Sequence, residues 1–430
     1  MREALNTIIS DFQERRLPVC TRRETVFPVL PGKATVVMGM RRVGKTWFCY
    51  QRIADLLAQG VEKSRIIYLN FDDDRLLDFS VADFQTILDV YYARWPENKE
   101  RRCYFFFDEI QVINCWESFI RRLLDTEDVQ VTLTGSSSKM LSADIATSLR
   151  GRTVNCEIFP FSFREMLMAK GVFTVIPDHP GSRDTGKLRH ALAEYGQWGG
   201  FPEVTAADVS LKREIVRSYM ETVLFKDVIE RHKVANVLAL RHLMTAILSQ
   251  PGQQFSVNKL HNTLKSKGIP CAKNALYEYI DHLADAYFAH RLPLYSDSAR
   301  VRQVNPDKMY GNDLALHGLV LNRFGVEQGY TLETLVFLHL RRSGRQLFYV
   351  RDRDNREIDF LTIDPTSGKR ALIQVCANIS APETLARELR AFNAPPNEAR
   401  DAEKIVVTLD DSRDFDGGIS AIPAWKFLNT

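Results

Sequence analysis

The feature of this sequence that most restricts its fold is the segment GMRRVGKT, which spans residues 39–46. An apolar, β-branched run at residues 34–38 comes directly before it, and a helix-like stretch at residues 47–57 comes directly after it. The two glycines, Gly39 and Gly44, allow the backbone to turn tightly and to point its N–H groups inward. A strand, a glycine loop and a helix in this order form a cradle for the phosphates of a nucleotide.

The residue types of this loop assign a role to each part of a triphosphate site. Lys45 reaches the β and γ phosphates, and Thr46 offers a hydroxyl ligand to Mg²⁺. The following helix presents its positive N-terminal end to the same anion. We therefore predict that ATP and Mg²⁺ are bound here. The predicted nucleotide-binding residues are Gly39, Met40, Arg41, Arg42, Val43, Gly44, Lys45, Thr46 and Trp47.

A second motif supports the first. The aromatic run at residues 103–107 is typical of a buried strand, and it ends in Asp108 and Glu109. At the end of such a strand, Asp108 is expected to hold the Mg²⁺ shell and Glu109 to polarise the attacking water as a general base. The alternative is that these acids only cap the helix predicted at residues 112–124. The upstream loop favours catalysis, so we predict an ATPase that converts ATP to ADP and phosphate.

Length and charge limit the remaining possibilities. A chain of 430 residues suggests two to three domains. The net charge is +3, from 57 basic and 54 acidic residues, so the whole chain carries no electrostatic footprint for nucleic acid. The seven cysteines form no C-x-x-C pair, which argues against structural zinc and for a reducing compartment. No apolar signal core or membrane-length segment is present, so we expect a cytoplasmic protein.

The first part of the chain alternates strands with helices. An amphipathic lead-in helix, with Leu5, Ile8, Ile9 and Phe12 on one face, precedes the first strand. Helices between consecutive strands favour a mostly parallel, three-layer α/β sheet. The predicted strands are residues 35–38, 66–71, 103–107, 129–134 and 155–159.

Three further residues are candidates for catalysis. Ser136 follows the fourth predicted strand, beside the catalytic strand, where a polar side chain can sense the γ-phosphate or the attacking water. The alternative is an ordinary N-cap for a helix at residues 139–149. Arg150 and Arg152 flank a glycine, and either is a candidate arginine finger for the transition-state charge, acting in its own chain or in a neighbour. The alternative is a surface arginine.

Taken in order, these motifs resemble the AAA-type P-loop ATPases of the archaeal-ATPase group, which are bacterial and archaeal proteins usually described only as ATP-binding proteins. The motifs that carry the resemblance are GMRRVGKT, YFFFDEIQ, LTGSSSKML, SLRGR and FPFSFREML. The segments WGGFPE (198–203), KDVIER (226–231) and KMYGND (308–313) resemble that group's companion C-terminal domain of unknown function. The resemblance implies an AAA-type ATPase domain over residues 1–170 but assigns little biology.

A second domain is predicted over residues 187–317, after a Gly- and Pro-rich linker at residues 171–187. It begins as a helical stretch and then shows a helix, a turn and a helix within residues 255–283. A strand at residues 287–292 fits the wing of a winged helix.

The second helix of this motif would expose Lys273, Asn274 and Tyr277. Such a face can read DNA, with basic side chains on phosphates and polar ones on base edges. In ATPases the same module often packs against a neighbouring domain instead. The near-neutral chain favours packing over DNA binding.

The third predicted domain, residues 318–430, resembles the restriction-endonuclease-like α/β fold. Glu333, Asp359 and Gln374 follow the order of that fold's metal site, and Cys376 stands where its lysine belongs. Glutamine supplies no charge to a metal and cysteine supplies no ammonium. We therefore predict a vestigial nuclease site without nuclease activity. The alternative is that Lys369 or Glu388, from a neighbouring element, supplies the missing lysine or acid.

The leading functional hypothesis is an ATP-hydrolysing AAA-type switch or motor whose C-terminal domains recognise an unknown protein partner. The alternative is a DNA-processing or DNA-binding ATPase that uses the winged helix and the nuclease-like domain. A scaffold that binds ATP without turnover is disfavoured by intact Lys45, Asp108 and Glu109. Assembly into a homo-oligomer is left open, and no membrane association is expected.

Overall fold

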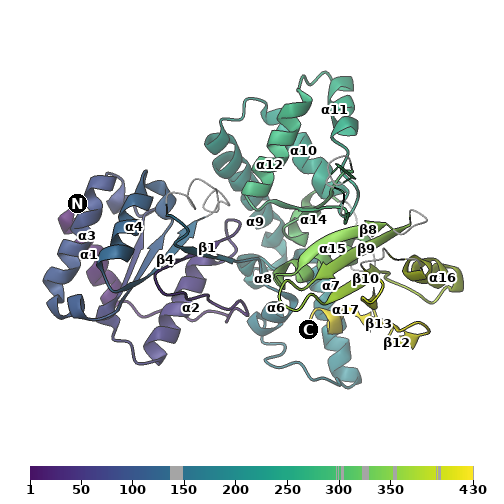
Figure 1. Ribbon diagram of the computed structural model, residues 1–430, viewed down its shortest axis with the longest axis horizontal. Helices are drawn as coiled ribbons and strands as arrows, with labels where there is room; N and C mark the ends of the chain where they lie inside the picture. Colours follow the sequence, from purple (N-terminus) through teal and green to yellow (C-terminus); the bar gives the residue numbers. More distant parts are fainter. Residues whose placement is uncertain are drawn as a thin grey trace. The chain divides into compact units, whose positions relative to one another are not determined.

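The computed structural model describes residues 1–135, 149–296, 298, 300–301, 305–321, 329–351, 356–393, 395 and 399–429. The chain divides into two compact units, Met1–Ile158 and Phe159–Thr430 (Figure 1). Each unit is built around its own sheet. No helix among the described residues is long and apolar enough to cross a membrane.

The first unit is built on a five-stranded sheet in the order β2-β3-β4-β1-β5, and all of its strand pairs are parallel. The strands are β1 Ala34–Met38, β2 Ile66–Asn70, β3 Cys103–Asp108, β4 Val129–Gly135 and β5 Thr153–Glu157. The parallel α/β sheet predicted from the sequence is confirmed, and each strand lies within two residues of its predicted bounds. Strand β1 is buried at every position, as expected for a strand covered on both faces.

Helices cover both faces of this sheet (Figure 1). They are α1 Arg2–Glu14, α2 Lys45–Ala58, α3 Phe84–Arg94 and α4 Trp116–Thr126, with short 3₁₀ turns at Lys63–Arg65, Asp74–Leu76, Val81–Asp83, Pro96–Glu100 and Ile110–Val112. Strand β3 alternates its side chains between the two layers. Phe106 packs in one cluster with Phe12 of α1 and Ile53 of α2. Phe107 contacts Phe119 of α4 on the other face.

The lead-in helix is therefore part of this core. Leu5, Ile8, Ile9 and Phe12, which the sequence placed on one face, are all buried in α1. The helix predicted at residues 112–124 begins at Trp116, because the 3₁₀ turn Ile110–Val112 and the left-handed Cys115 (φ 59°) intervene. The predicted helix at residues 139–149 lies almost entirely outside the described residues.

The second unit begins with a series of helices. They are α6 Phe163–Ala169, α7 Ser182–Trp198, α8 Pro202–Ala206, α9 Val209–Thr222, the π-helix η7 Val223–Glu230 and α10 Val237–Ser249. Helix α7 starts inside the segment predicted as a linker, so the irregular connection is shorter than expected. The residues that precede α7, 177–181, hold the Pro and Gly that gave the linker signal.

A helix, a turn and a helix follow, as the sequence predicted. Helix α11 spans Val257–Ser266 and helix α12 spans Lys273–Asp285. Strand β6 (Ala289–Leu292) pairs in antiparallel register with β7 (Lys308–Gly311). Helix α14, Leu314–Val320, comes next and contacts α7, α9 and α10. Whether this arrangement works as a winged helix stays a prediction.

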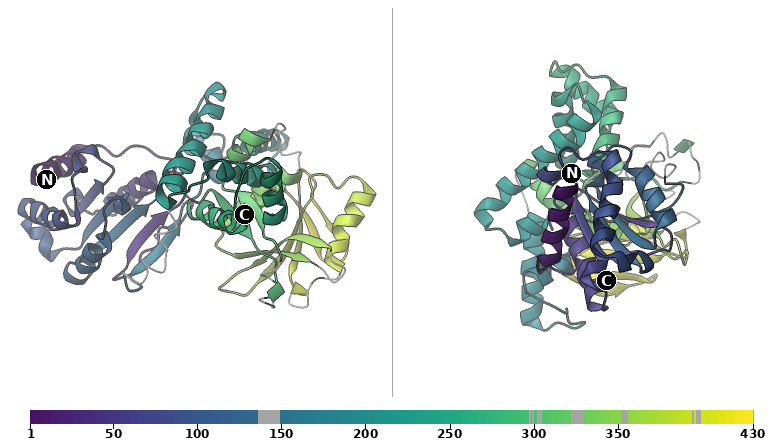
Figure 2. Two further views of the ribbon diagram at one scale, coloured as in Figure 1. Left: turned by 90° about the horizontal axis from the view of Figure 1, so that it is seen from above. Right: turned by 90° about the vertical axis from the view of Figure 1, so that its left-hand side faces the viewer.

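The second sheet has six strands in the order β12-β13-β11-β10-β9-β8. They are β8 Gln346–Arg351, β9 Glu357–Ile363, β10 Arg370–Val375, β11 Glu403–Thr408, β12 Arg413–Phe415 and β13 Ile419–Pro423, and β10, β11 and β13 are parallel. Helices α15 (Gly329–Arg342) and α17 (Ala424–Phe427) pack on one face, and α16 (Pro382–Arg390), with the 3₁₀ turn Ala391–Asn393, packs on the other. Figure 2 shows this sheet from another direction in green to yellow.

Two sequence motifs of the second unit explain each other in its core. Gly200 N–H donates to Asp313 Oδ2 at 2.8 Å, and Phe161 N–H donates to Gly200 O at 2.6 Å. A Cβ at Gly199 would lie 1.7 Å from Asp313 Oδ1, so only glycine fits there. The segments WGGFPE and KMYGND therefore meet through the buried carboxylate of Asp313, and the backbone of Gly200 also pairs with that of Phe161.

Candidate functional site

The glycine loop connects β1 to α2 at the carboxyl ends of the parallel strands. Gly39 has φ 148°, and a Cβ there would lie 2.1 Å from the carbonyl oxygen of Ile158. Gly44 has φ 95°, a left-handed conformation that side-chain-bearing residues rarely adopt. These two positions therefore require glycine, as the sequence argument assumed. Met40 and Val43 are fully buried and anchor the loop to the core.

Lys45 is the first residue of α2, and it is only 6% exposed. Its ammonium donates to the carbonyl oxygens of Gly39 and Met40, both at 3.1 Å. Carbonyl dipoles solvate an ammonium without cancelling its charge. The positive charge is therefore held within the loop, where phosphate oxygens of a bound nucleotide would lie.

Thr46 and Asp108 meet directly, although they come from α2 and β3. The Thr46 hydroxyl donates to Asp108 Oδ2 at 2.7 Å, and Asp108 is 2% exposed. The Tyr68 hydroxyl donates to the same oxygen at 2.6 Å. Burial and then the charge of Asp108 raise the pKa of Tyr68, so this phenol stays a proton donor. A hydroxyl and a carboxylate side by side fit the oxygen ligands that Mg²⁺ prefers.

Glu109 is positioned by the neighbouring strand. Its backbone is left-handed, with φ 53°, and its N–H donates to Thr134 Oγ1 at 3.0 Å. The Thr134 hydroxyl in turn donates to Asp108 Oδ1, and the Gln111 side chain donates to the Glu109 carboxylate. Left-handed conformations in residues other than glycine often occur at functional sites. Thr134 thus connects the two acids that the sequence assigned to metal binding and water activation.

The sequence argument missed two residues that contact the predicted site. Thr134 is a polar residue near the end of β4, the strand that pairs with β3, and it lies two positions before Ser136. Ser136 itself lies outside the described residues. Arg23 is 7% exposed and donates to the carbonyl oxygen of Val43 at 2.6 Å, which braces the loop from the lead-in segment. The signal for Thr134 was its strand-end position, whereas Arg23 had no local signal.

The remaining predicted loop residues lie at the surface. Arg42 has φ 68° and is exposed, and Arg41 is half-buried. The indole of Trp47 is 47% exposed and meets the Tyr50 ring edge-on at 6.2 Å.

The structure does not bring Arg150 and Arg152 to the glycine loop of their own chain. The Arg152 carbonyl accepts a hydrogen bond from Ala34 N–H at the start of β1, whereas the loop follows the other end of that strand. The five residues of this strand span roughly 13 Å from the first Cα to the last. Arg152 also forms an ion pair with Asp125, and Arg150 is exposed.

The second unit contains a cluster of charges around the buried Lys308, a residue that the sequence argument did not assign to any site. Lys308 lies on β7 and is 1% exposed. Its ammonium lies 2.7 Å from Glu357, 3.0 Å from Glu333 and 3.6 Å from Asp359. Burial alone would lower the pKa of Lys308, but the three carboxylates outweigh it and raise that pKa. The lysine therefore stays charged among the acids.

The predicted vestigial residues Glu333, Asp359 and Gln374 do come together in this cluster. The Asp359 N–H donates to Gln374 Oε1 at 3.3 Å, and Gln374 Nε2 donates to Glu388 Oε2 at 2.8 Å. Burial, and then the charge of Glu333, raise the pKa of Asp359 to about 8. Lys369 precedes β10, at the opposite end of the strand from Gln374, so it does not supply the missing lysine.

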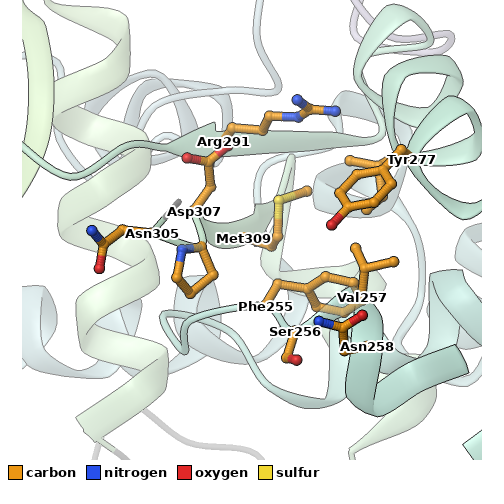
Figure 3. Close-up of a pocket in the computed structure, with 11 residues that line it drawn as sticks. Phe255, Ser256, Val257, Asn258, Tyr277, Arg291, Asn305, Asp307 and Met309 are labelled. Carbon is orange, nitrogen blue, oxygen red and sulfur yellow. The ribbon is translucent and has the colours of Figure 1, made fainter. Parts of the chain in front are cut away.

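The second unit also has a pocket of about 400 Å³, lined by residues of α11, α12, β6 and β7. Figure 3 shows Tyr277 on one side, Asp307 and Asn305 on the other, and Phe255 and Met309 between them. Arg291 lines the pocket and pairs with Asp281. The predicted exposure of Lys273, Asn274 and Tyr277 on α12 is confirmed.

Family comparisons divide the chain into three matches. Residues 31–167 match an AAA domain. Residues 189–327 and 328–427 match two different domains of unknown function. The loop, Asp108, Glu109 and Thr134 all fall inside the AAA match, and Lys308 and Asp359 fall in one unknown domain each.

Two relatives that match most of this chain are uncharacterized proteins. The chain is 32% identical to the uncharacterized protein MJ1544 of Methanocaldococcus jannaschii, over 95% of this chain and 91% of that protein. It is 30% identical to an uncharacterized protein of Haemophilus influenzae, over 76% and 78%. Among solved structures, the Walker-type ATPase PABY2304 of Pyrococcus abyssi matches 74% of this chain and 95% of that chain, with a TM-score of 0.42 and 12% identity.

Proposed function

Because this chain belongs to the family of the uncharacterized protein MJ1544 and carries an AAA domain, we propose that it binds ATP with Mg²⁺ and hydrolyses it to ADP and phosphate. The observation that carries this proposal is the convergence of Thr46, Asp108 and Glu109 beside Lys45. These residues come from the end of β3 and the start of α2. Hydrogen bonds join Thr46 to Asp108 and, through Thr134 near the end of β4, Asp108 to Glu109.

Each residue then has a chemical task in this proposal. Lys45 binds phosphate oxygens through its ammonium, and the helix N-terminus adds the positive end of its dipole. Mg²⁺, held by Thr46 and Asp108, would neutralise charge on the β and γ phosphates. Glu109 accepts hydrogen bonds from the attacking water and polarises it. Thr134 fixes the position of the Glu109 backbone and so aims its carboxylate.

The test is Glu109→Gln in the full chain. The substitution keeps the size of the side chain but removes the base, so we expect ATP turnover to fall by about 10²–10⁴-fold while ATP binding is retained. Glu97→Gln is the matched control, because Glu97 lies on the exposed turn Pro96–Glu100. Phosphate release and the affinity for a fluorescent ATP analogue are measured side by side. Unchanged turnover would remove Glu109 from catalysis.

We also propose that one arginine of the pair Arg150 and Arg152 completes the site of a second copy of this chain. Both lie at the amino ends of the strands, whereas their own glycine loop follows the carboxyl end of β1. Arg152 pairs with Asp125, which favours Arg150 as the finger. Mixing Lys45→Ala with Arg150→Ala should restore turnover, because one chain supplies the site and the other the finger. A mixture of Lys45→Ala with Glu109→Gln is the control without rescue. No rescue, with a rate per chain that is independent of concentration, rejects a finger in trans.

The second unit is proposed to recognise a protein partner. The pocket beside Tyr277 combines apolar Phe255 and Met309 with an acid, Asp307, and a base, Arg291. A mixed surface of this kind suits a peptide better than a phosphate backbone, which calls for clustered basic side chains. The test is the ATPase rate with and without duplex DNA at several salt concentrations. Stimulation that falls with salt and is lost in Lys273→Ala would favour the alternative, a DNA-processing ATPase.

A further inference from the structure

Among the described residues, one group of His, Cys, Asp and Glu side chains brings three metal-ligand atoms together. It consists of His232, His282 and Asp285, whose ligand atoms all lie within 4.8 Å of one another. All three side chains are partly buried, so they are neither loose on the surface nor sealed from solvent. The group lies in the second unit and shares no residue with the glycine loop or with the Lys308 cluster.

Local structure explains how these distant residues meet. His282 and Asp285 are three residues apart on α12, a spacing that places both side chains on one face of the helix. His232 ends the long helical segment that begins with α9 and continues through η7, because Lys233 is left-handed with φ 52°. The imidazole rings of His232 and His282 stack with centroids 3.7 Å apart and planes 14° apart.

The π-helix η7 contributes to the contact between His232 and His282. It has eight residues, Val223–Glu230, and it directly precedes Arg231 and His232. A π-helix turns less per residue than an α-helix, so it changes the direction in which the following side chains point. Such segments are rare and often lie at functional sites. Here the altered direction brings His232 against α12, as the stacked rings show.

The ligand set selects the chemistry. Two imidazole nitrogens and one carboxylate oxygen suit Zn²⁺, whereas Mg²⁺ and Ca²⁺ prefer oxygen ligands throughout. Four-coordinate zinc, with ligands at about 2.0–2.1 Å, holds its ligand atoms roughly 3.4 Å apart. The observed limit of 4.8 Å exceeds this by about 1.4 Å. Binding one ion therefore requires the two imidazoles to rotate about their side-chain bonds and leave their parallel stack, because a metal ion lies in the plane of each ring that binds it.

We propose that His232, His282 and Asp285 bind one Zn²⁺ ion, which joins the end of the α9–η7 segment to α12. Three protein ligands leave the fourth position to water, as in zinc sites that remain open. The ion stabilises the contact between the two helical segments, because it binds the folded arrangement and not the separated ligands. His232 and His282 are far apart in sequence, so no short motif reveals this site.

The experiment uses the full chain after removal of metal with a chelator, in the absence of nucleotide. Zn²⁺ is titrated by calorimetry, and Co²⁺ is used as a spectroscopic substitute. We expect one ion per chain and visible Co²⁺ bands of a four- or five-coordinate nitrogen and oxygen site. Asp285→Asn should weaken Zn²⁺ binding by at least about 10-fold, because losing a ligand costs no less than losing a group that orients one.

His190→Ala is the matched control, since His190 is an exposed histidine on α7 outside the group. It should bind Zn²⁺ as the wild type does. Zn²⁺ should also raise the unfolding temperature of the wild type and of His190→Ala, but not that of Asp285→Asn or His282→Gln. Circular dichroism of the metal-free variants confirms that they are folded.

Three results overturn the proposal. The first is the absence of Zn²⁺ binding in the micromolar range by the wild type. The second is equal binding by the wild type and by the Asp285→Asn, His282→Gln double variant. The third is a Co²⁺ spectrum dominated by thiolate charge transfer, which would assign the metal to the cysteines. In each case the stacked histidines are a packing contact only.

Discussion

Two of the lysines that are buried in the described part of the chain, Lys45 and Lys308, lie in different electrostatic surroundings. Lys45, in the glycine loop, is 6% exposed and donates to two neutral carbonyl oxygens. Lys308, in the second unit, is 1% exposed and lies among the carboxylates of Glu333, Glu357 and Asp359. The first arrangement holds a positive charge toward a ligand, whereas the second compensates negative charges within the protein.

The surroundings of Lys45 are those of an anion-binding site, whereas the acids around Lys308 already have a cation within the protein. Phosphate oxygens gain strong, charge-assisted hydrogen bonds from an ammonium that is held in a glycine loop at a helix N-terminus. A divalent metal gains least where an ammonium already lies between the acids that would bind it. We therefore expect the glycine loop to bind its ligand strongly and the Lys308 cluster to act as a structural element.

The largest expected effect comes from replacing each lysine by methionine, which keeps the stem and removes the charge. Lys308→Met leaves three partly buried acids without their buried cation and should destabilise the second unit by up to about 3–5 kcal/mol. Hydrogen exchange of peptides from β7 and β9 measures this loss locally, as faster exchange by roughly 100-fold or more. Lys45→Met should instead weaken ATP binding by about 10–150-fold, the value of hydrogen bonds to a charged group.

Each variant is the control for the other. Lys45→Met should leave exchange in β7 and β9 unchanged, and Lys308→Met should bind ATP normally when it is folded. If Lys308→Met exchanges as slowly as the wild type, the cluster is not held together by its lysine. If Lys45→Met binds ATP with wild-type affinity, the loop lysine is not the phosphate ligand.

A smaller effect is expected from pH. The pKa of Asp359 is about 8 in the folded protein, against an ordinary value of 3.8, because of burial and Glu333. The folded state therefore binds more protons than the unfolded state between these values, so this contribution to stability is present at low pH and lost as the pH rises through about 8. The wild type should lose more of its unfolding temperature between pH 6 and pH 9 than Asp359→Asn.

The groups that surround Asp359 sharpen this test. Glu333 and Glu357 raise its pKa, while Lys308 and the backbone N–H of Val375 lower it. Lys308→Met in the same pH series should move the loss of stability to higher pH, because removing the cation favours the protonated acid further. Identical pH profiles for the wild type and Asp359→Asn would show that Asp359 does not titrate in this window.

The prediction with the smallest expected signal concerns nuclease activity. We expect no cleavage of supercoiled, linear or single-stranded DNA or of RNA with Mg²⁺ or Mn²⁺, with or without ATP. The predicted resemblance to a restriction-endonuclease-like fold assigns Gln374 and Cys376 to the positions where nuclease chemistry needs an acid and a lysine, and the Lys308 ammonium contacts both Glu333 and Asp359. Cleavage by the wild type that disappears in Asp359→Ala would overturn this expectation and assign catalysis to the Lys308 cluster.

The sequence alone was sufficient for most of the first unit. Gly39 and Gly44 are required by backbone conformation, and that requirement is local, so the motif specifies the loop. The buried strands were found because each is an apolar run between turn signals, a pattern that parallel sheets produce. Asp108 and Glu109 were assigned because they follow such a strand. Thr46 follows β1 and Asp108 ends β3, and only β4 lies between these two strands in the sheet, so the two side chains are able to meet.

Only the tertiary structure decided the rest. Lys308, Glu333 and Asp359 lie on β7, α15 and β9, and no spacing in the sequence indicates that they meet. Sequence spacing likewise gives no indication that Arg23 contacts the glycine loop or that His232 contacts α12. The sequence by itself determined the residues whose role depends on their own backbone and immediate neighbours. Packing between distant segments determined which charges are paired, because electrostatic interactions depend on distances in space and on burial, not on position along the chain.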